Sequence, residues 1–176
     1  TEVDEGALGA RITEWKLPAA RLAHDTDFDE HNGKFYTTDE AVDQILITDP
    51  KTNKTTSVPI PDLGVPPGGR FGELNLPIPF HQNNRHGVHS LQMGPDGKYY
   101  LTEAIASAIT VFDPATNKFE PHIIPGKALY PHTLRIDSHG LVWFTIQGSN
   151  QFGRYDPKTH AITVVELPTD MARKDE

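Results

Sequence analysis

The feature that most constrains this chain is an internal repeat. An apolar residue followed by proline closes a strand-like run four times, and the successive proline spacings are 43, 64 and 43 residues; the pairs are Leu17-Pro18, Ile60-Pro61, Ile124-Pro125 and Leu167-Pro168. An Asp-Pro-x-Thr turn recurs in the same register at residues 49–54, 113–118 and 156–160. Self-similarity at a fixed period of this length indicates a repeat architecture in which each copy is one supersecondary unit.

Each copy is predicted to form four short strands. The first strand starts at a histidine in every copy: His24, His89 and His132. A glycine-containing turn leads to an aromatic second strand, and the third strand ends in the Asp-Pro turn, whose proline presets φ for a type I turn. The fourth strand runs into the apolar-proline pair. Four antiparallel strands in about 40–45 residues are typical of a propeller blade, so we predict an all-β β-propeller architecture.

The register sets the boundaries of three full repeats. We predict blades over residues 19–61, 62–125 and 126–168, followed by a solvated tail at 169–176. The middle repeat is 21 residues longer than the others, and the excess maps to an inserted loop at about 62–85. Long loops on rigid scaffolds are often functional. Its apolar and proline-rich composition favours packing against the channel mouth or against a neighbouring chain.

Residues 11–18 match the fourth strand of a blade, and we predict that they form the outer strand of a preceding blade. Propellers typically need four to eight blades to close. Three repeats plus one N-terminal outer strand therefore predict an incomplete ring with exposed blade faces, which are association surfaces. We expect either a longer propeller or another chain or copy that completes the ring.

Composition excludes several classes of function. The net charge of −8 comes from acidic residues scattered along the 176 residues, so no basic stripe predicts a nucleic-acid partner. The absence of cysteine excludes disulfides, thiolate zinc sites, iron–sulfur clusters and covalent haem attachment. No apolar run approaches the roughly 18 residues of a spanning helix. No leader precedes Thr1, so we expect no membrane insertion and a soluble chain that is a processed or cut product.

The third copy carries the most complete motif. It reads Tyr130-Pro131-His132, then Leu-Val-Trp-Phe-Thr at 141–145, Asn-Gln-Phe-Gly-Arg-Tyr-Asp at 150–156, and a strand from Ile162 to Leu167-Pro168. This register resembles the repeat of streptogramin (virginiamycin B) lyases, and the resemblance covers nearly the whole chain outside residues 62–85. It implies a seven-bladed propeller that binds magnesium and opens a cyclic depsipeptide by elimination, with a histidine as general base and glutamates near the metal. By analogy it also implies a periplasmic or secreted protein.

The resemblance assigns roles to only some residues. His132 matches the position of the catalytic base, but Tyr130 stands where the family has a glutamate two residues earlier. The acidic position after the aromatic strand is Asp39 in the first copy and Glu103 in the second, and it is Ile146 in the third. A complete lyase constellation is therefore not present in these blades.

The residues on their own also predict a site. Inner strands of a propeller converge on a central channel, so the three strand-opening histidines are expected at one mouth of it, as metal ligands or as a base. Alternatively they cap the inner strands or line a wet channel. The candidate catalytic residues are His132, His89 and Glu103, with Glu103 and His89 as the best histidine–carboxylate pair. The candidate ligands for Mg²⁺ or another divalent cation are His24, His89, His132, Glu103 and Asp39.

Two functions remain open on this evidence. The first is a lyase, or a metal-dependent hydrolase of similar scaffold, that acts on a small cyclic ester or lactone substrate. The second is a non-catalytic propeller module for protein–protein assembly, in which the channel histidines are structural. Fold alone does not choose between them, since propellers host unrelated functions.

Overall fold

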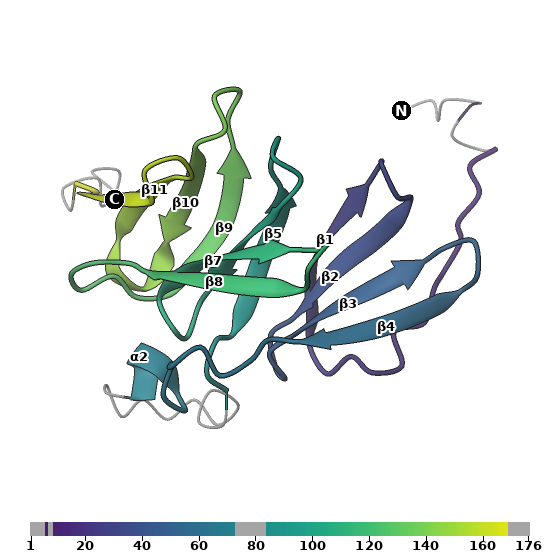
Figure 1. Cartoon of the computed structure of the whole chain (residues 1–176), viewed down its shortest axis with the longest axis horizontal. Coiled ribbons are helices and arrows are strands. Elements are labelled where there is room, and N and C mark those ends of the chain that lie inside the picture. Colours follow the sequence, from purple (N-terminus) through teal and green to yellow (C-terminus); the bar gives the residue numbers. More distant parts are fainter. Residues whose placement is uncertain (1–5, 7–8, 73–83, 169–176) are drawn as a thin grey trace, which may run out of the picture.

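The computed structural model describes residues 6, 9–72 and 84–168, and its architecture confirms the predicted all-β fold (Figure 1). Twelve strands form three antiparallel four-stranded sheets, each in simple sequence order. The first blade contains β1 (Ala23–Asp29), β2 (Lys34–Asp39), β3 (Gln44–Asp49) and β4 (Lys54–Pro59). The second contains β5 (Val88–Met93), β6 (Tyr99–Glu103), β7 (Ala108–Asp113) and β8 (Lys118–Ile123). The third contains β9 (Pro131–Ile136), β10 (Val142–Ile146), β11 (Gln151–Asp156) and β12 (Ala161–Glu166).

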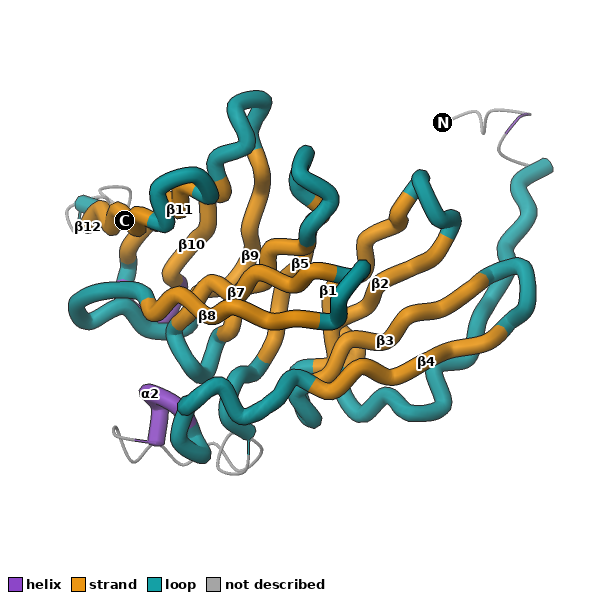
Figure 2. The backbone as a smooth tube through the Cα atoms, viewed as in Figure 1, coloured by secondary structure: helices purple, strands orange, loops and turns teal. Residues whose placement is uncertain are grey.

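The blades lie beside one another through their first strands. β5 contacts both β1 and β9, so the second blade is flanked by the other two, and the described blades do not close a ring (Figure 2). Among the described residues, helical structure is limited to α2 (Gly69–Gly72), the 3₁₀ turn η2 (Gln147–Ser149) and an isolated helical residue at Gly6. No helix in the described part of the chain is long and apolar enough to span a bilayer.

The Asp-Pro turn is built in the same way in all three blades. The aspartate accepts a hydrogen bond from the backbone N–H two residues later, at 2.8 Å for Asp49, 2.8 Å for Asp113 and 2.9 Å for Asp156. These backbone donors are the main reason that the pKa of each carboxyl lies below its usual value. The turn ends in a left-handed residue, Asn53 or Asn117 at φ 55° and His160 at φ 57°. Asparagine tolerates this conformation better than most residues.

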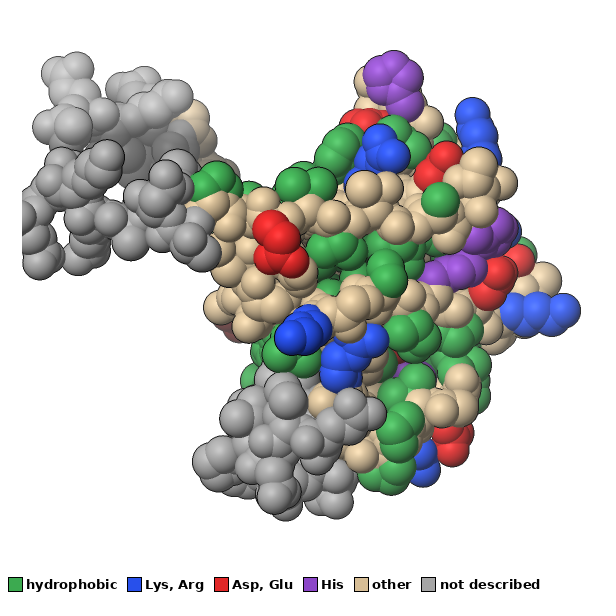
Figure 3. Space-filling view, turned by 90° about the vertical axis from the view of Figure 1, so that its left-hand side faces the viewer, with side chains coloured by type: hydrophobic (Ala, Val, Ile, Leu, Met, Phe, Trp, Pro, Cys, Tyr) green, Lys and Arg blue, Asp and Glu red, His purple; other side chains and the backbone are tan. Residues whose placement is uncertain are grey.

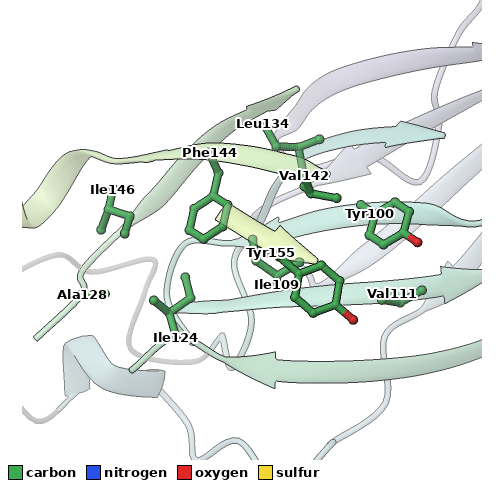
Figure 4. Close-up of a cluster of buried hydrophobic side chains, with 10 residues drawn as sticks. All are labelled: Tyr100, Ile109, Val111, Ile124, Ala128, Leu134, Val142, Phe144, Ile146 and Tyr155. Carbon is green, nitrogen blue, oxygen red and sulfur yellow. The ribbon is translucent and has the colours of Figure 1, made fainter. Parts of the chain in front are cut away.

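Two apolar clusters hold the blades together. Tyr36, Ile45, Leu91, Tyr99 and Phe112 belong to the cluster between the first and second blades. The cluster between the second and third blades is drawn in Figure 4, where Ile109 and Tyr100 of the second blade face side chains of the third; its members are Tyr100, Ile109, Val111, Ile124, Ala128, Leu134, Val142, Phe144, Ile146 and Tyr155. Burial of aromatic and branched side chains on both sides of the second blade supplies most of the packing free energy.

In the first and second blades, a threonine of the second strand links the blade to the next one. The hydroxyl of Thr38 donates to the carbonyl oxygen of His89 at 2.7 Å, and that of Thr102 donates to the carbonyl oxygen of His132 at 2.5 Å. The third equivalent, Thr145, is exposed on the open face of the third blade. The same residue therefore links blades wherever a following blade is present.

The structure differs from the sequence prediction at the N-terminal segment. Residues 11–18, predicted as the outer strand of a preceding blade, form no strand. A strand needs a ladder partner, and no described strand pairs with this segment. Its Trp15 ring instead lies 5.4 Å from the ring of Phe35 and covers part of the first blade.

The inserted loop is described at residues 62–72 and 84–85, and the rest of it lies outside the described residues. α2 in this loop lies at the end of the blades where β5 begins (Figure 1). The Arg70 guanidinium donates to the carbonyl oxygens of Ile124, Gly126 and Ala128 at 3.1, 3.2 and 2.8 Å. The described part of the insertion is therefore fastened to the linker between the second and third blades.

Candidate active site at the channel mouth

The three strand-opening histidines form a stacked row. The ring centroids of His24 and His89 lie 3.6 Å apart, those of His89 and His132 lie 3.8 Å apart, and both pairs are tilted by 43°. His89 is the central ring and is 2% exposed, whereas His132 is half-buried and His24 is exposed. The convergence of inner strands thus brings together three imidazoles that are more than 40 residues apart in sequence.

A backbone irregularity places each imidazole. The register of β1 against β2 shifts between Ala23 and Thr26, that of β5 against β6 shifts between Val88 and Leu91, and that of β9 against β10 shifts at residues 131–134. In each blade, the segment over which the register shifts contains the strand-opening histidine. Such bulges re-aim side chains and are frequent beside active sites. The threonine-to-carbonyl bonds described above fix the backbone of His89 and His132 from the neighbouring blade.

Burial and mutual proximity keep the central imidazole neutral. Burial, followed by the neighbouring His132 and His24, lowers the pKa of His89 to about 3. Burial and His24 also lower the pKa of His132. The Nδ1 atom of His89 is buried and has no hydrogen-bond partner. Neutral imidazoles keep a nitrogen lone pair, so His89 and His132 offer metal-binding or proton-accepting atoms at neutral pH.

A glutamate and a tyrosine join the row from different blades. The Tyr130 hydroxyl, at the start of the third blade, donates to Glu40 Oε1 of the first blade at 3.0 Å. Ligand atoms of His24, Glu40 and His89 all lie within 4.8 Å of one another. Burial raises the pKa of Glu40, although the Tyr130 hydrogen bond and the His24 charge act in the opposite direction. Burial and the Glu40 charge raise the pKa of Tyr130, which keeps the phenol protonated.

The expected pairing of Glu103 with His89 is not what the structure contains. Glu103 Oε2 lies 2.8 Å from Nδ1 of His86, which is three residues before His89, and Glu103 Oε1 has no partner. His86 Nε2 donates to the carbonyl oxygen of Pro61 at 2.9 Å. Side chains three apart in an extended segment face different ways, so His86 turns toward the acid while His89 turns into the row.

Burial alone would lower the pKa of His86, but the Glu103 hydrogen bond and charge outweigh it and raise that pKa. Both side chains are almost fully buried. This pair is therefore a buried ionic contact behind the channel mouth.

Asp39, proposed above as a metal ligand, instead accepts hydrogen bonds from backbone N–H groups. Its carboxylate accepts from the backbone N–H groups of Arg21 and Leu22 and from the Gln44 amide, each at 2.8 Å. Three donors occupy its two oxygens, so the acid that reaches the histidines from this corner is the next residue, Glu40. The repeat contained a signal for Glu40, since its counterparts are Ala104 and Gln147 and it alone is acidic.

A polar hollow of about 380 Å³ runs along the inner strands beside the row. Its lining includes His24, Asp25, Gln92 and Arg135. A small polar ligand in this hollow would therefore meet a cation, an acid and an imidazole in one place.

The arrangement of the blades is similar to that in solved structures of two lyases. A catalytically inactive virginiamycin B lyase from Staphylococcus aureus, solved with quinupristin, superposes with a TM-score of 0.70 at 21% identity, over 92% of this chain and 47% of that one. A streptogramin B lyase structure gives a TM-score of 0.71 at 20% identity, over 92% of this chain and 46% of that one. The chain has the β-propeller fold of the virginiamycin B lyases. It spans less than half of the length of either lyase.

The same fold also occurs in a protein complex. A chain of a nidogen/laminin complex superposes with a TM-score of 0.58 at 14% identity, over 85% of this chain and 49% of that one. No known protein-family profile matches the sequence, and no curated protein matches it. The virginiamycin B lyase-like fold is thus shared by proteins with different roles, and the site must carry the functional argument.

Proposed function

We propose that the channel mouth is the active site of a lyase that opens a small cyclic ester. The observation that carries the proposal is the stacked row of three imidazoles, with the pKa values of His89 and His132 lowered, beside Glu40, Tyr130 and a polar hollow. Burial lowers the pKa of His132, so the imidazole is unprotonated at neutral pH and is ready to accept a proton. The likeness of the fold to virginiamycin B lyase supports the same reaction class.

His132 is the proposed general base. In this elimination it takes a proton from the carbon next to the one that bears the ester oxygen, a carbon–carbon double bond forms, and the carbon–oxygen bond breaks to release a carboxylate. Arg135, on the same strand and at the wall of the hollow, is placed to bind an anionic group. Tyr130 acts as a positioning residue, because its hydroxyl fixes Glu40 beside the histidines.

The residues also fit a divalent cation. His24, His89 and Glu40 would hold it, and the unpartnered buried Nδ1 of His89 is the atom that most needs such a partner. Two imidazoles and one carboxylate suit a transition metal such as Zn²⁺ or Mn²⁺ better than Mg²⁺, which prefers oxygen ligands. A metal bound there would polarise the ester carbonyl.

The test is ring opening of a streptogramin B-type depsipeptide, followed by chromatography of the linear product. We expect His132→Ala to lower the rate by about 10²–10⁴-fold, the usual contribution of a general base. The matched control is His139→Ala, which removes an exposed histidine on a loop outside the channel and should leave the rate unchanged. Equal rates for His132→Ala and the wild type would rule out His132 as the base.

A second candidate function is assembly, and the open face of the third blade favours it. Trp143 and Phe152 stack there at 5.7 Å, and Val165 is 55% exposed. A second copy or another chain that covers this face would bury the aromatic pair and place a partner beside Thr145. Sedimentation equilibrium tests this idea, because a monomer of 19.5 kDa that unfolds cooperatively would contradict it.

A further inference from the structure

A second group of ligand-type side chains lies at the outer rim, away from the channel. We call it the rim cluster: Glu120 and His122 on β8 of the second blade, and His160 in the turn between β11 and β12 of the third. His122 Nε2 lies 3.4 Å from His160 Nδ1 and 3.5 Å from Glu120 Oε1, and His160 Nδ1 lies 3.6 Å from Glu120 Oε1. The three atoms therefore form a nearly equilateral triangle.

The size of this triangle matches one face of a metal coordination shell. Nitrogen and oxygen ligands that lie about 2.0–2.1 Å from a zinc ion at the corners of a tetrahedron are roughly 3.3–3.4 Å apart. The observed edges exceed this by only 0.0–0.3 Å. Two imidazoles and one carboxylate form a common three-residue ligand set for Zn²⁺.

The repeat shows that these residues are particular to one blade interface. In the strand register, Glu120 corresponds to Thr56 and Thr163, and His122 corresponds to Val58 and Val165. His160 corresponds to Asn53 and Asn117, which have the same left-handed conformation. At the interface between the first and second blades, the matching positions are a threonine, a valine and an asparagine, and Val58 packs in the apolar cluster. The fold therefore does not require ligand-type side chains at this register.

A tyrosine of the third blade contacts two of the three candidate ligands. The Tyr155 hydroxyl lies 3.0 Å from His122 Nε2 and 3.1 Å from His160 Nδ1. The phenol is therefore a hydrogen-bonding neighbour of both imidazoles, and the three other side chains supply the ligands.

We propose that Glu120, His122 and His160 form a divalent transition-metal site of the Zn²⁺ type that joins the second blade to the third. The ligands come from both sides of the interface, so bound metal would resist separation of the two blades. Because Glu120 and His160 are exposed, the metal can enter from solvent and a water molecule can complete its shell. The site is independent of the channel mouth and of the function proposed for it.

The test is a Zn²⁺ titration of the chelator-treated full chain, followed by a chromogenic competitor and by thermal unfolding. The test variants are Glu120→Thr, His122→Val and His160→Asn, each of which installs the residue that another blade carries at that position and so preserves the fold. Each variant should lose one Zn²⁺ equivalent or weaken it at least about tenfold, since even outer-shell changes cost 10–100-fold. Zn²⁺ should raise the midpoint of unfolding of the wild type, and this rise should shrink in His160→Asn.

Two controls make the assignment specific. Tyr155→Phe removes the hydroxyl but no proposed ligand, and Phe112 already stands at this position in the second blade, so Zn²⁺ binding should persist. His139→Ala removes an exposed histidine elsewhere and should also retain it. Zn²⁺ held by the channel histidines would be unaffected by the three rim variants. Wild-type stoichiometry and affinity in His160→Asn and His122→Val would overturn the proposal.

Discussion

The second and third blades have the same strand plan but different surroundings. β6 and β7 of the second blade are buried at every position except the last residue of β7, whereas β10 and β11 of the third alternate between buried and more accessible residues. Thr102 is buried against the third blade, while its counterpart Thr145 is exposed. A blade sequence therefore specifies two packing faces, and neighbours decide which of them are covered.

The open face of the third blade has the character of an interface. Trp143 stacks on Phe152, and the Arg154 guanidinium lies 5.7 Å from the centre of the Trp143 ring. Figure 3 views the molecule from this side and shows hydrophobic side chains between charged ones. Aromatic residues and arginine are enriched at protein interfaces. The contrast with the second blade can be tested at matched positions.

The largest expected difference concerns Ile109 and Phe152, which occupy the same position of β7 and β11. Ile109 is fully buried between blades, so Ile109→Ala should lower the free energy of unfolding by about 2–5 kcal/mol. Phe152→Ala should cost less than half as much, because its ring lies on the open face. Urea unfolding of both variants measures the two values, and equal losses would contradict the contrast between the blades.

A smaller difference is expected at the threonine positions. Thr102→Val removes the hydrogen bond to the His132 carbonyl and the one that the hydroxyl accepts from the buried Ser90 N–H, at a cost of about 1–3 kcal/mol. Thr145→Val should change the free energy of unfolding by no more than about 0.5 kcal/mol, as for other exposed sites. Chemical denaturation at one pH gives both numbers. A costly Thr145→Val would show that its face is already covered in solution.

The buried His86–Glu103 pair predicts a pH dependence that the third blade lacks, because Ile146 stands at the position of Glu103. The pKa of folded His86 is raised above its ordinary value of 6.5. Its contribution to stability is therefore complete below about pH 6.5 and is lost as pH rises through the folded-state pKa, with a slope of at most about 1.4 kcal/mol per pH unit. Unfolding curves across this window should show the slope in the wild type.

The control for this pH effect is His86→Gln, which keeps a hydrogen-bonding side chain but does not titrate. Its free energy of unfolding should lack that component of the slope. An identical pH dependence in the two proteins would show that His86 does not bind an extra proton in the folded state.

The smallest effect on stability is expected at the exposed Val165 of the open face. Val165→Lys should alter the free energy of unfolding by about 0.5 kcal/mol or less, because the side chain is 55% exposed. It should nevertheless reduce the sedimentation-average mass if a second copy covers this face, since a buried unpaired charge opposes association. An unchanged assembly in this variant would place the contact elsewhere.

The repeat predicted most of the fold because its signals are local. Turn aspartates, left-handed asparagines and alternating apolar residues act within a few positions, so the four-stranded units and their strand order followed from spacing. The segment at 11–18 was different. Its sequence resembles an outer strand, but pairing depends on a partner strand that the described residues do not include.

The site was predictable only in part. His24, His89 and His132 recur in register, and their convergence follows from the geometry of inner strands. Glu40 was missed in favour of Asp39, because the sequence does not show which acid is occupied by backbone donors. Likewise, the sequence does not show that Tyr130 crosses to Glu40, 90 residues away.

The sequence by itself therefore determined the blade, its repeat length and the residue that opens each inner strand, because these depend on local periodicity and turn chemistry. Only the tertiary structure decided which acid meets which histidine, since that depends on bulges and on contacts between blades. It turned Glu103 toward His86 and brought Glu120, His122 and His160 into one triangle at the rim. The sequence specifies the chemistry of each side chain, but the packing of the blades sets the distances between them.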